Sequence, residues 1–143
     1  MIKGHSIFLA GGCGSIGQSI LKKLISEETQ IMVFDKNKKI INKLKKKYSS
    51  NKNIIFMYGD ILSISDINQA INKCLKNFSS IDSAINCTLP NVKQRKVFSK
   101  INKRYLNNEF QNHLTSSIIF SKKILKYFLK NKKGKLLNFS SIY

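Results

Sequence analysis

The chain has 143 residues, 42% of them hydrophobic, which is enough for one domain with a real core. It carries 26 Lys and Arg against 7 Asp and Glu, a formal net charge of +19. The lysines are scattered over every predicted helix with little aromatic interleaving, so we expect no nucleic-acid partner and keep a basic nucleic-acid-binding protein as an alternative. No apolar run reaches membrane-spanning or signal-peptide length, which predicts a cytoplasmic protein that does not bind membranes.

The cysteine and proline content of the sequence indicates a single domain whose cysteines are reduced thiols. Cys13, Cys74 and Cys87 are odd in number, widely spaced and without metal-ligand spacing, so we predict free thiols and no metal. The chain has one proline, Pro90, and no Ser/Gly-rich linker. Residues 1–143 are therefore expected to form one domain.

A short apolar run at 5–10 meets a glycine-rich loop, which then opens into a helical pattern at 18–25. The loop consists of Gly11, Gly12, Cys13, Gly14, Ser15, Ile16 and Gly17. Two spacings fit a dinucleotide-binding loop: Gly12-x-Gly14-x-x-Gly17 and Gly11-x-x-Gly14-x-x-Gly17. Such glycines allow a tight turn and let the backbone approach a pyrophosphate, which the helix N-terminus then binds. An ordinary glycine-rich turn is the alternative.

Apolar strands alternate with amphipathic helices along the rest of the chain. Further strands are predicted at 30–34, 53–58, 81–86 and 135–139. One helix has Ile40, Ile41, Leu44 and Tyr48 at core spacing, and the next, capped by Ser65, has Ile67, Ala70, Ile71, Cys74 and Leu75. This pattern predicts an α/β, Rossmann-like, doubly wound parallel sheet of order 3-2-1-4-5. Ligands should bind between strands one and four, at their carboxyl ends.

A polar segment at 87–99 is predicted to be a loop over the site, and a long helix should follow somewhere between Asn108 and Lys130, stopped by Gly134. We expect the sheet-facing residues to be Ile118, Ile119, Ile124, Leu125 and Phe128. The helix also has apolar residues that one sheet contact does not require, among them Phe110, Leu114, Phe120 and Tyr127. This surplus predicts an oligomer, a homodimer or tetramer, built through the helix.

The predicted cofactor contacts lie at strand ends. Asp35 ends the second strand about twenty residues after the loop, where a carboxylate accepts from ribose hydroxyls, which favours NAD(H) over NADP(H). Capping of the next helix is its alternative role. Asp60, with Ile61 after it, could accept from the adenine amine or simply form a turn. Small residues at 86–88 (Asn86, Cys87 and Thr88) let the backbone approach the cofactor.

Together these residues resemble the short-chain dehydrogenase/reductase family over essentially the whole chain. The resemblance rests on the glycine loop, Asp35, and the runs at 59–61, 86–88 and 137–141. A closer likeness, at 86–90, 113–115 and 140–143, is to flagellin-modification oxidoreductases. It implies a sugar-like small-molecule substrate in bacterial surface-glycan biosynthesis, such as that of nonulosonic acids.

The resemblance also implies a catalytic Asn, Ser, Tyr and Lys. Ser141 matches the serine that polarises the substrate. The Asn position falls on His113 or on Asn112, and a core histidine is the alternative reading of His113. The Tyr and Lys are expected a short way beyond Ser141 and have no counterpart before Tyr143. We therefore expect the N-terminal part of a longer oxidoreductase, truncated before its last strands and inactive alone; an inert dinucleotide-binding sensor is the alternative.

Overall fold

The computed structural model describes residues 2–88 and 97–139. The strands are β1 (Ser6–Ala10), β2 (Gln30–Asp35), β3 (Ile54–Tyr58), β4 (Ser83–Asn86) and β5 (Lys135–Asn138). The helices are α1 (Ser15–Ser26), α2 (Lys38–Lys47), α3 (Ile64–Phe78), the 3-10 turn η2 (Phe98–Lys100), α4 (Lys103–Phe110), the π-helical turn η3 (Gln111–Thr115) and α5 (Ser116–Lys130). None of these helices is both long and apolar enough to cross a membrane.

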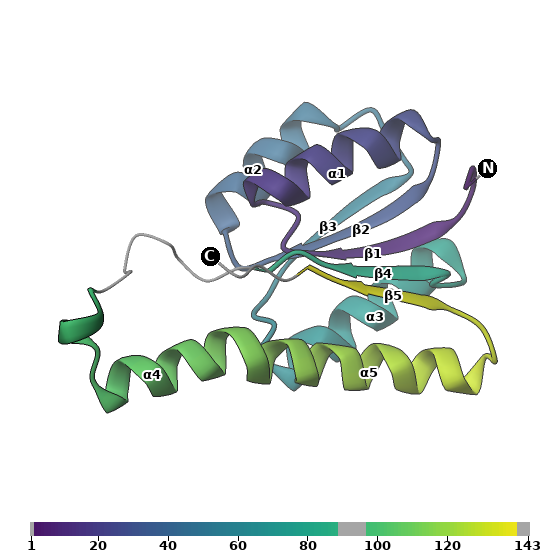
Figure 1. Cartoon of the computed structure of the whole chain (residues 1–143). Helices are drawn as coiled ribbons and strands as arrows, with labels where there is room; N and C mark the ends of the chain where they lie inside the picture. Colours follow the sequence, from purple (N-terminus) through teal and green to yellow (C-terminus); the bar gives the residue numbers. More distant parts are fainter. Residues whose placement is uncertain (1, 89–96, 140–143) are drawn as a thin grey trace.

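The five strands form one parallel sheet in the order β3-β2-β1-β4-β5, which confirms the predicted topology. Helices α1 and α2 cover one face, and α3 and α5 cover the other (Figure 1). Both faces of the central strands are thus shielded from water, and every residue of β1 is buried.

Two apolar clusters hold the layers together. The cluster under α1 and α2 includes Leu9, Leu21, Val33, Ile41 and Phe56. The cluster against α3 and α5 includes Phe8, Met32, Ile67, Phe120 and Ile124. The side chains of alternate strand residues enter opposite clusters, as the two-residue repeat of a strand requires.

Helix α3 begins two residues earlier than the expected cap, Ser65, would allow. Ser63, not Ser65, is the N-cap, and its hydroxyl accepts a hydrogen bond from the backbone N–H of Asp66 at 3.2 Å. With Ile64 as the first helical residue, Ser65 lies inside the first turn and the prediction for it was wrong. The predicted apolar face is confirmed, since Ile67, Ala70 and Cys74 are buried and Ile71 and Leu75 pack partly against the same cluster.

The long helix begins at Lys103, before the predicted range, and α4, η3 and α5 form one continuous rod that runs past the carboxyl ends of the strands (Figure 1). Its buried stripe advances in steps of four residues, through Ser116, Phe120, Ile124 and Phe128. Ile118 lies about 200° around the helix from the start of that stripe.

Four assignments on this helix were therefore wrong. Ile118 and Leu125, expected against the sheet, are 55% and 44% exposed. Phe120, expected on an outer face, is fully buried, and the half-buried Tyr127 accepts a hydrogen bond from the backbone N–H of Ile81 at 3.2 Å. Most of the predicted loop over the site, residues 89–96, lies outside the described residues.

Candidate dinucleotide-binding site

The predicted cofactor residues converge at the carboxyl ends of β1, β2 and β4. The backbone N–H of Gly11 donates to Phe34 O at 2.9 Å, and that of Cys87 donates to Ala10 O at 2.9 Å. The glycine loop therefore leaves the sheet between its two neighbouring strands, where an open parallel sheet binds its ligand.

Sterics require glycine at both ends of the loop. Gly11 has a φ of +77°, and a Cβ there would lie 2.7 Å from the backbone N of Thr88. A Cβ on Gly17 would collide with the carbonyl oxygen of Gly11, which is why helix and loop can pack so closely. Gly14 differs, because among the described residues the nearest atom to its Cβ position, the carbonyl oxygen of Gly11, is 3.5 Å away. The fold does not need glycine at Gly14, which fits a position kept open for a ligand.

Within the part of the chain that the structure describes, no side chain caps the N-terminus of α1. The N-cap is Gly14, and the first turn contains no acidic residue. The side chains of Ser15 and Ile16 are exposed at the mouth of the loop. The amide of Gln18 donates to Cys13 O at 2.8 Å and steadies the loop from inside. Uncapped N–H groups and the helix dipole are the features that bind a pyrophosphate.

Asp35 is fixed beside this loop. Its Oδ2 accepts from the backbone N–H of Cys13 at 2.9 Å, and its Oδ1 accepts from that of Asn37 at 2.8 Å. The cap of α2 is Asn37, whose side chain accepts from Ile40 N, so capping by Asp35 was the wrong alternative. A carboxylate has about four lone-pair sites, so Asp35 keeps acceptor capacity for ribose hydroxyls.

The two cysteines of the site are neutral. Burial, followed by the charge and hydrogen bonding of Asp35, raises the pKa of Cys13 to about 12. Burial raises the pKa of Cys87 to about 11. Neither thiol therefore adds negative charge where a pyrophosphate would bind. All three cysteines are free, and the described residues contain no group of three or more His, Cys, Asp or Glu side chains that could hold a metal ion.

Asp60 serves the turn after β3. Its Oδ1 accepts from Leu62 N at 2.9 Å, while its own N–H donates to Asp66 Oδ2 at 2.8 Å. Ile61 is half-buried against the cluster under α3. The backbone N–H of Gly59 donates to Asp35 O at 3.1 Å, so Asp60 lies near the predicted ribose carboxylate. The turn role is established, and the adenine contact stays a prediction.

Asn86 is buried and all its polar capacity is used within the protein. Its Nδ2 donates to Ser117 Oγ at 3.3 Å and to Asn138 Oδ1 at 3.2 Å. Its Oδ1 accepts from the N–H and the hydroxyl of Thr88, at 3.1 and 2.6 Å. Asn138 in turn donates to Ser121 Oγ at 3.3 Å. Asn86 therefore holds Thr88 at the carboxyl end of β4 rather than offering its amide to a ligand.

Sequence reasoning missed Ser117 and Asn138 as partners of Asn86, and Ser121 as the partner of Asn138. The useful signal was the four-residue spacing of the two serines, which places both on one side of α5.

His113 lies on the π-helical turn, on the part of the rod beyond the strands. Its side chain is 43% exposed, and its Nε2 is 3.1 Å from Glu109 Oε2. The core-histidine alternative was therefore wrong. The partner Glu109 was not predicted, although the spacing of four residues indicates such a pair. Asn112 accepts a hydrogen bond from Ser116 through its backbone carbonyl. Ser141 lies outside the described residues.

Known proteins share both sequence and fold with this chain. The sequence profile of the short chain dehydrogenase family matches residues 5–143. Post-translational flagellin modification protein A of Campylobacter coli is 27% identical over 99% of this chain and 57% of its own length. Cis-2,3-dihydrobiphenyl-2,3-diol dehydrogenase of Paraburkholderia xenovorans is 26% identical over 59% of this chain and 30% of its own length.

Solved structures with the same fold include dehydrogenases and reductases. A short chain dehydrogenase from Bacillus anthracis superposes with a TM-score of 0.86 at 18% identity, over 96% of this chain and 57% of that protein. A 3-ketoacyl-(acyl-carrier-protein) reductase from Brucella melitensis, complexed with NADH, gives 0.84 at 14% identity, over 99% and 59%. ElxO with NADP bound gives 0.84 at 20% identity, over 97% and 56%.

The chain thus spans well under two thirds of the length of these relatives. The solved structures fall below 25% identity and show the fold alone, whereas the profile covers nearly every residue of the chain. The chain belongs to the short chain dehydrogenase family.

Proposed function

We propose that the protein is a cytoplasmic oxidoreductase that uses NAD(H) in preference to NADP(H). The observation that carries the proposal is the carboxylate of Asp35, held 2.9 Å from the backbone N of Cys13 in the glycine loop. With a pyrophosphate on the N-terminus of α1, an acidic group at the end of β2 is placed to accept from ribose hydroxyls. Its negative charge also repels the 2′-phosphate of NADP(H).

Bound NAD(H) would donate or accept the hydride. The residues of this chain would bind and orient it: the N–H groups at the start of α1 for the pyrophosphate, and Asp35 for the ribose. The open space at Gly14 allows close approach of the backbone. Asn86 holds Thr88 in place through both its N–H and its hydroxyl, so this wall of the crevice is fixed before the cofactor arrives.

The test is a calorimetric titration of the purified protein with NADH and with NADPH. We expect tighter binding of NADH. Lys36 and Lys38 follow Asp35 closely and are exposed, so they are nearby cations that could favour a phosphate. Tighter binding of NADPH would contradict the proposed preference.

For the substrate we propose a sugar-like hydroxyl or ketone, by analogy with the flagellin modification relative. Ser141 would polarise the substrate oxygen, and His113 would hold a water or a proton near it. The family resemblance implies a Tyr and a Lys as the acid/base pair, and residues 1–143 contain no counterpart of them.

We therefore expect the 143-residue chain to bind NAD(H) without turnover. NADH formation with a panel of sugar and simple secondary alcohols is the assay. Turnover that disappears in Ser141→Ala would contradict this expectation and indicate that another group, such as His113, accepts the proton.

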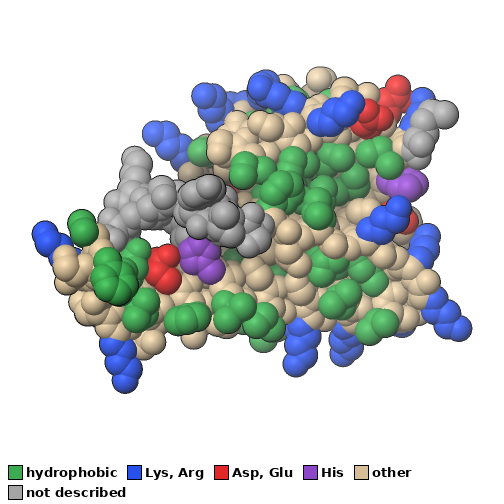
Figure 2. Space-filling model, viewed as in Figure 1, with side chains coloured by type: hydrophobic (Ala, Val, Ile, Leu, Met, Phe, Trp, Pro, Cys, Tyr) green, Lys and Arg blue, Asp and Glu red, His purple; other side chains and the backbone are tan. Residues whose placement is uncertain are grey.

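We further propose a homodimer or tetramer formed through the α4–α5 rod. An exposed apolar stripe runs along it at helical spacing and consists of Phe110, Leu114, Ile118, Leu125 and Leu129. Figure 2 shows hydrophobic side chains along the length of this helix. Light scattering should give a multiple of the protomer mass, and Ile118→Glu should reduce it to a monomer while Lys22→Glu on α1 does not. A monomer at micromolar concentration would contradict this proposal.

A further inference from the structure

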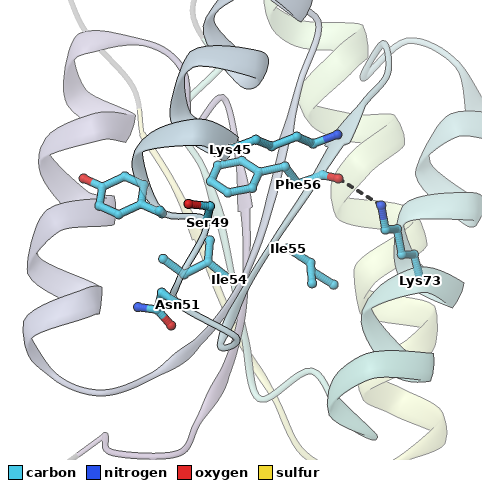
Figure 3. A pocket seen from close by; sticks show the side chains of 8 residues that line it. Lys45, Ser49, Asn51, Ile54, Ile55, Phe56 and Lys73 are labelled. Carbon is cyan, nitrogen blue, oxygen red and sulfur yellow. Dashed lines mark hydrogen bonds between the residues drawn. The ribbon is translucent and has the colours of Figure 1, made fainter.

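Strand β3 is an edge of the sheet, and it opens on a hollow of about 270 Å³. The hollow lies between the end of α2 and the side of α3. Lys45 enters it from α2 and Lys73 from α3, with Phe56 of the strand between them (Figure 3). The lining thus combines strand backbone with two cationic side chains.

The backbone of β3 alternates between its paired and its open side. Asn53 O accepts from Ile31 N at 2.7 Å, and Gly59 N donates to the last residue of β2 at 3.1 Å, so odd-numbered residues pair with β2. Even-numbered residues direct their N–H and C=O groups to the open side; these are Ile54, Phe56 and Tyr58.

Two of these outward groups already have partners. At the start of the strand, the backbone N–H of Ile54 donates to Asn51 O at 3.3 Å. Lys73 Nζ donates to the carbonyl oxygen of Phe56 at 2.9 Å. Partial burial of the amine, followed by the nearby charge of Lys45, lowers the pKa of Lys73. Charged side chains at a sheet edge, lysines above all, commonly prevent unwanted strand pairing, and Lys73 reaches this edge from α3. A carboxylate arriving between the two ammonium groups would relieve their repulsion and draw Lys73 away from the carbonyl.

The surrounding charge decides which strand can be added. Helix α2 contains six lysines and no acidic residue. Pairing of β3 with the same strand of a second copy would bring two such helices together, on chains of net charge +19 each. Self-pairing is therefore opposed by electrostatic repulsion, whereas an acidic segment is attracted.

We propose that the open edge of β3 binds an extended acidic peptide segment of a partner protein, which adds to the sheet as a sixth strand. Its main chain would pair with Phe56 and Tyr58, as in other cases of strand addition, and its carboxylates would pair with Lys45 and Lys73. The proposal is independent of the cofactor preference and of the reaction.

The probe is a fluorescein-labelled peptide of about six residues that alternates glutamate with valine, acetylated and amidated, at about 0.15 M salt. Fluorescence anisotropy with the purified protein should show saturable binding. Tyr58→Pro removes an outward N–H from an exposed residue, and Lys45→Glu reverses one charge; each should weaken binding by at least about tenfold. Lys22→Glu, the same charge reversal on α1, should leave it nearly unchanged.

A second probe does not alter the protein. The same peptide with every second amide N-methylated keeps its carboxylates and loses its strand hydrogen bonds, so we expect it to bind at least about tenfold more weakly. The comparison of the two peptides tests the proposal even if the Tyr58→Pro variant fails to fold. Equal binding of the methylated peptide, or tighter binding of a short single-stranded oligonucleotide that Lys45→Glu abolishes, would show general polyanion attraction and overturn the proposal.

Discussion

The carboxylate of Asp35 is the group whose removal tests the cofactor site most directly. Asp35→Ala removes the acceptor for the N–H groups of Cys13 and Asn37, both at 2.9 Å or less. Hydrogen bonds to a charged group are worth about 1.5–3 kcal/mol each when buried, and Asp35 is half-exposed, so we expect unfolding to become easier by about 1–3 kcal/mol in total.

The effect on ligand binding should be selective. Loss of the ribose contacts should weaken NADH binding by about 10- to 100-fold, equivalent to about 1.4–2.7 kcal/mol. NADPH binding should not fall by the same factor, since the variant also loses the charge that repels a 2′-phosphate. The ratio of the two dissociation constants, measured by calorimetric titration, should therefore narrow by at least about tenfold.

Two further variants separate the effect of the lost charge from the effect of the lost hydrogen bonds. Asp35→Asn keeps one acceptor oxygen and removes the charge, so it should recover part of the stability and still narrow the cofactor ratio. Glu28→Gln removes the same charge at an exposed site away from the loop and should change neither quantity. If Asp35→Ala weakens NADH and NADPH equally, Asp35 merely organises the loop and the reasoning on cofactor choice is refuted.

Other predictions concern the loop, a helix end and the sheet. Gly17→Ala should destabilise the fold by more than about 2 kcal/mol in denaturant unfolding, because its Cβ meets backbone, whereas Gly14→Ala should leave stability within about 0.5 kcal/mol and weaken NADH binding. Ser79 ends α3 with a φ of 65°, so Ser79→Gly should raise stability by about 0.5–1 kcal/mol; a lower melting temperature would contradict this. Burial acts to raise the pKa of Asp82, but hydrogen bonds, led by the one from the N–H of Ser6, lower it below the usual 3.8. The ionised carboxylate should therefore stabilise the fold at pH values above 3.8. This contribution to the free energy of unfolding should be lost as pH falls through the lowered pKa. Unfolding followed from pH 7 to about pH 2 should show this loss in the parent and not in Asp82→Asn.

The sheet could be predicted because each strand contains a short apolar run that is followed by a polar residue or a turn. Right-handed crossovers then leave few possible strand orders. The glycine loop could be predicted equally well, because its glycines all lie within one short stretch of sequence. The cap of α3 was misplaced because Ser63 and Ser65 are chemically equivalent, and only the three-dimensional course of the chain selects Ser63.

The long helix shows where the spacing of apolar residues fails to predict which face is buried. It carries apolar residues on two sides, so sequence spacing alone admits both the stripe through Phe120 and the one through Ile118. The position of β5 and α3 against the helix selects the first. Hydrogen bonds of the site were hidden for a similar reason: Asn86 reaches Ser117 and Asn138, which are 31 and 52 residues away in the chain.

The Asn86 contacts explain how one helix can serve two surfaces. Ser117 and Ser121 lie on the side of α5 that bonds Asn86 and Asn138, and therefore face the crevice end of β4 and β5. Ile118 lies on another side and is exposed. A partner packed against the exposed apolar stripe would contact the same rod that holds Asn86, and through it Thr88, beside the proposed cofactor site. Because interiors are close-packed, a shift of α5 at such an interface would change the Asn86 hydrogen bonds, whereas the glycine loop is held separately by β1, β2 and Asp35.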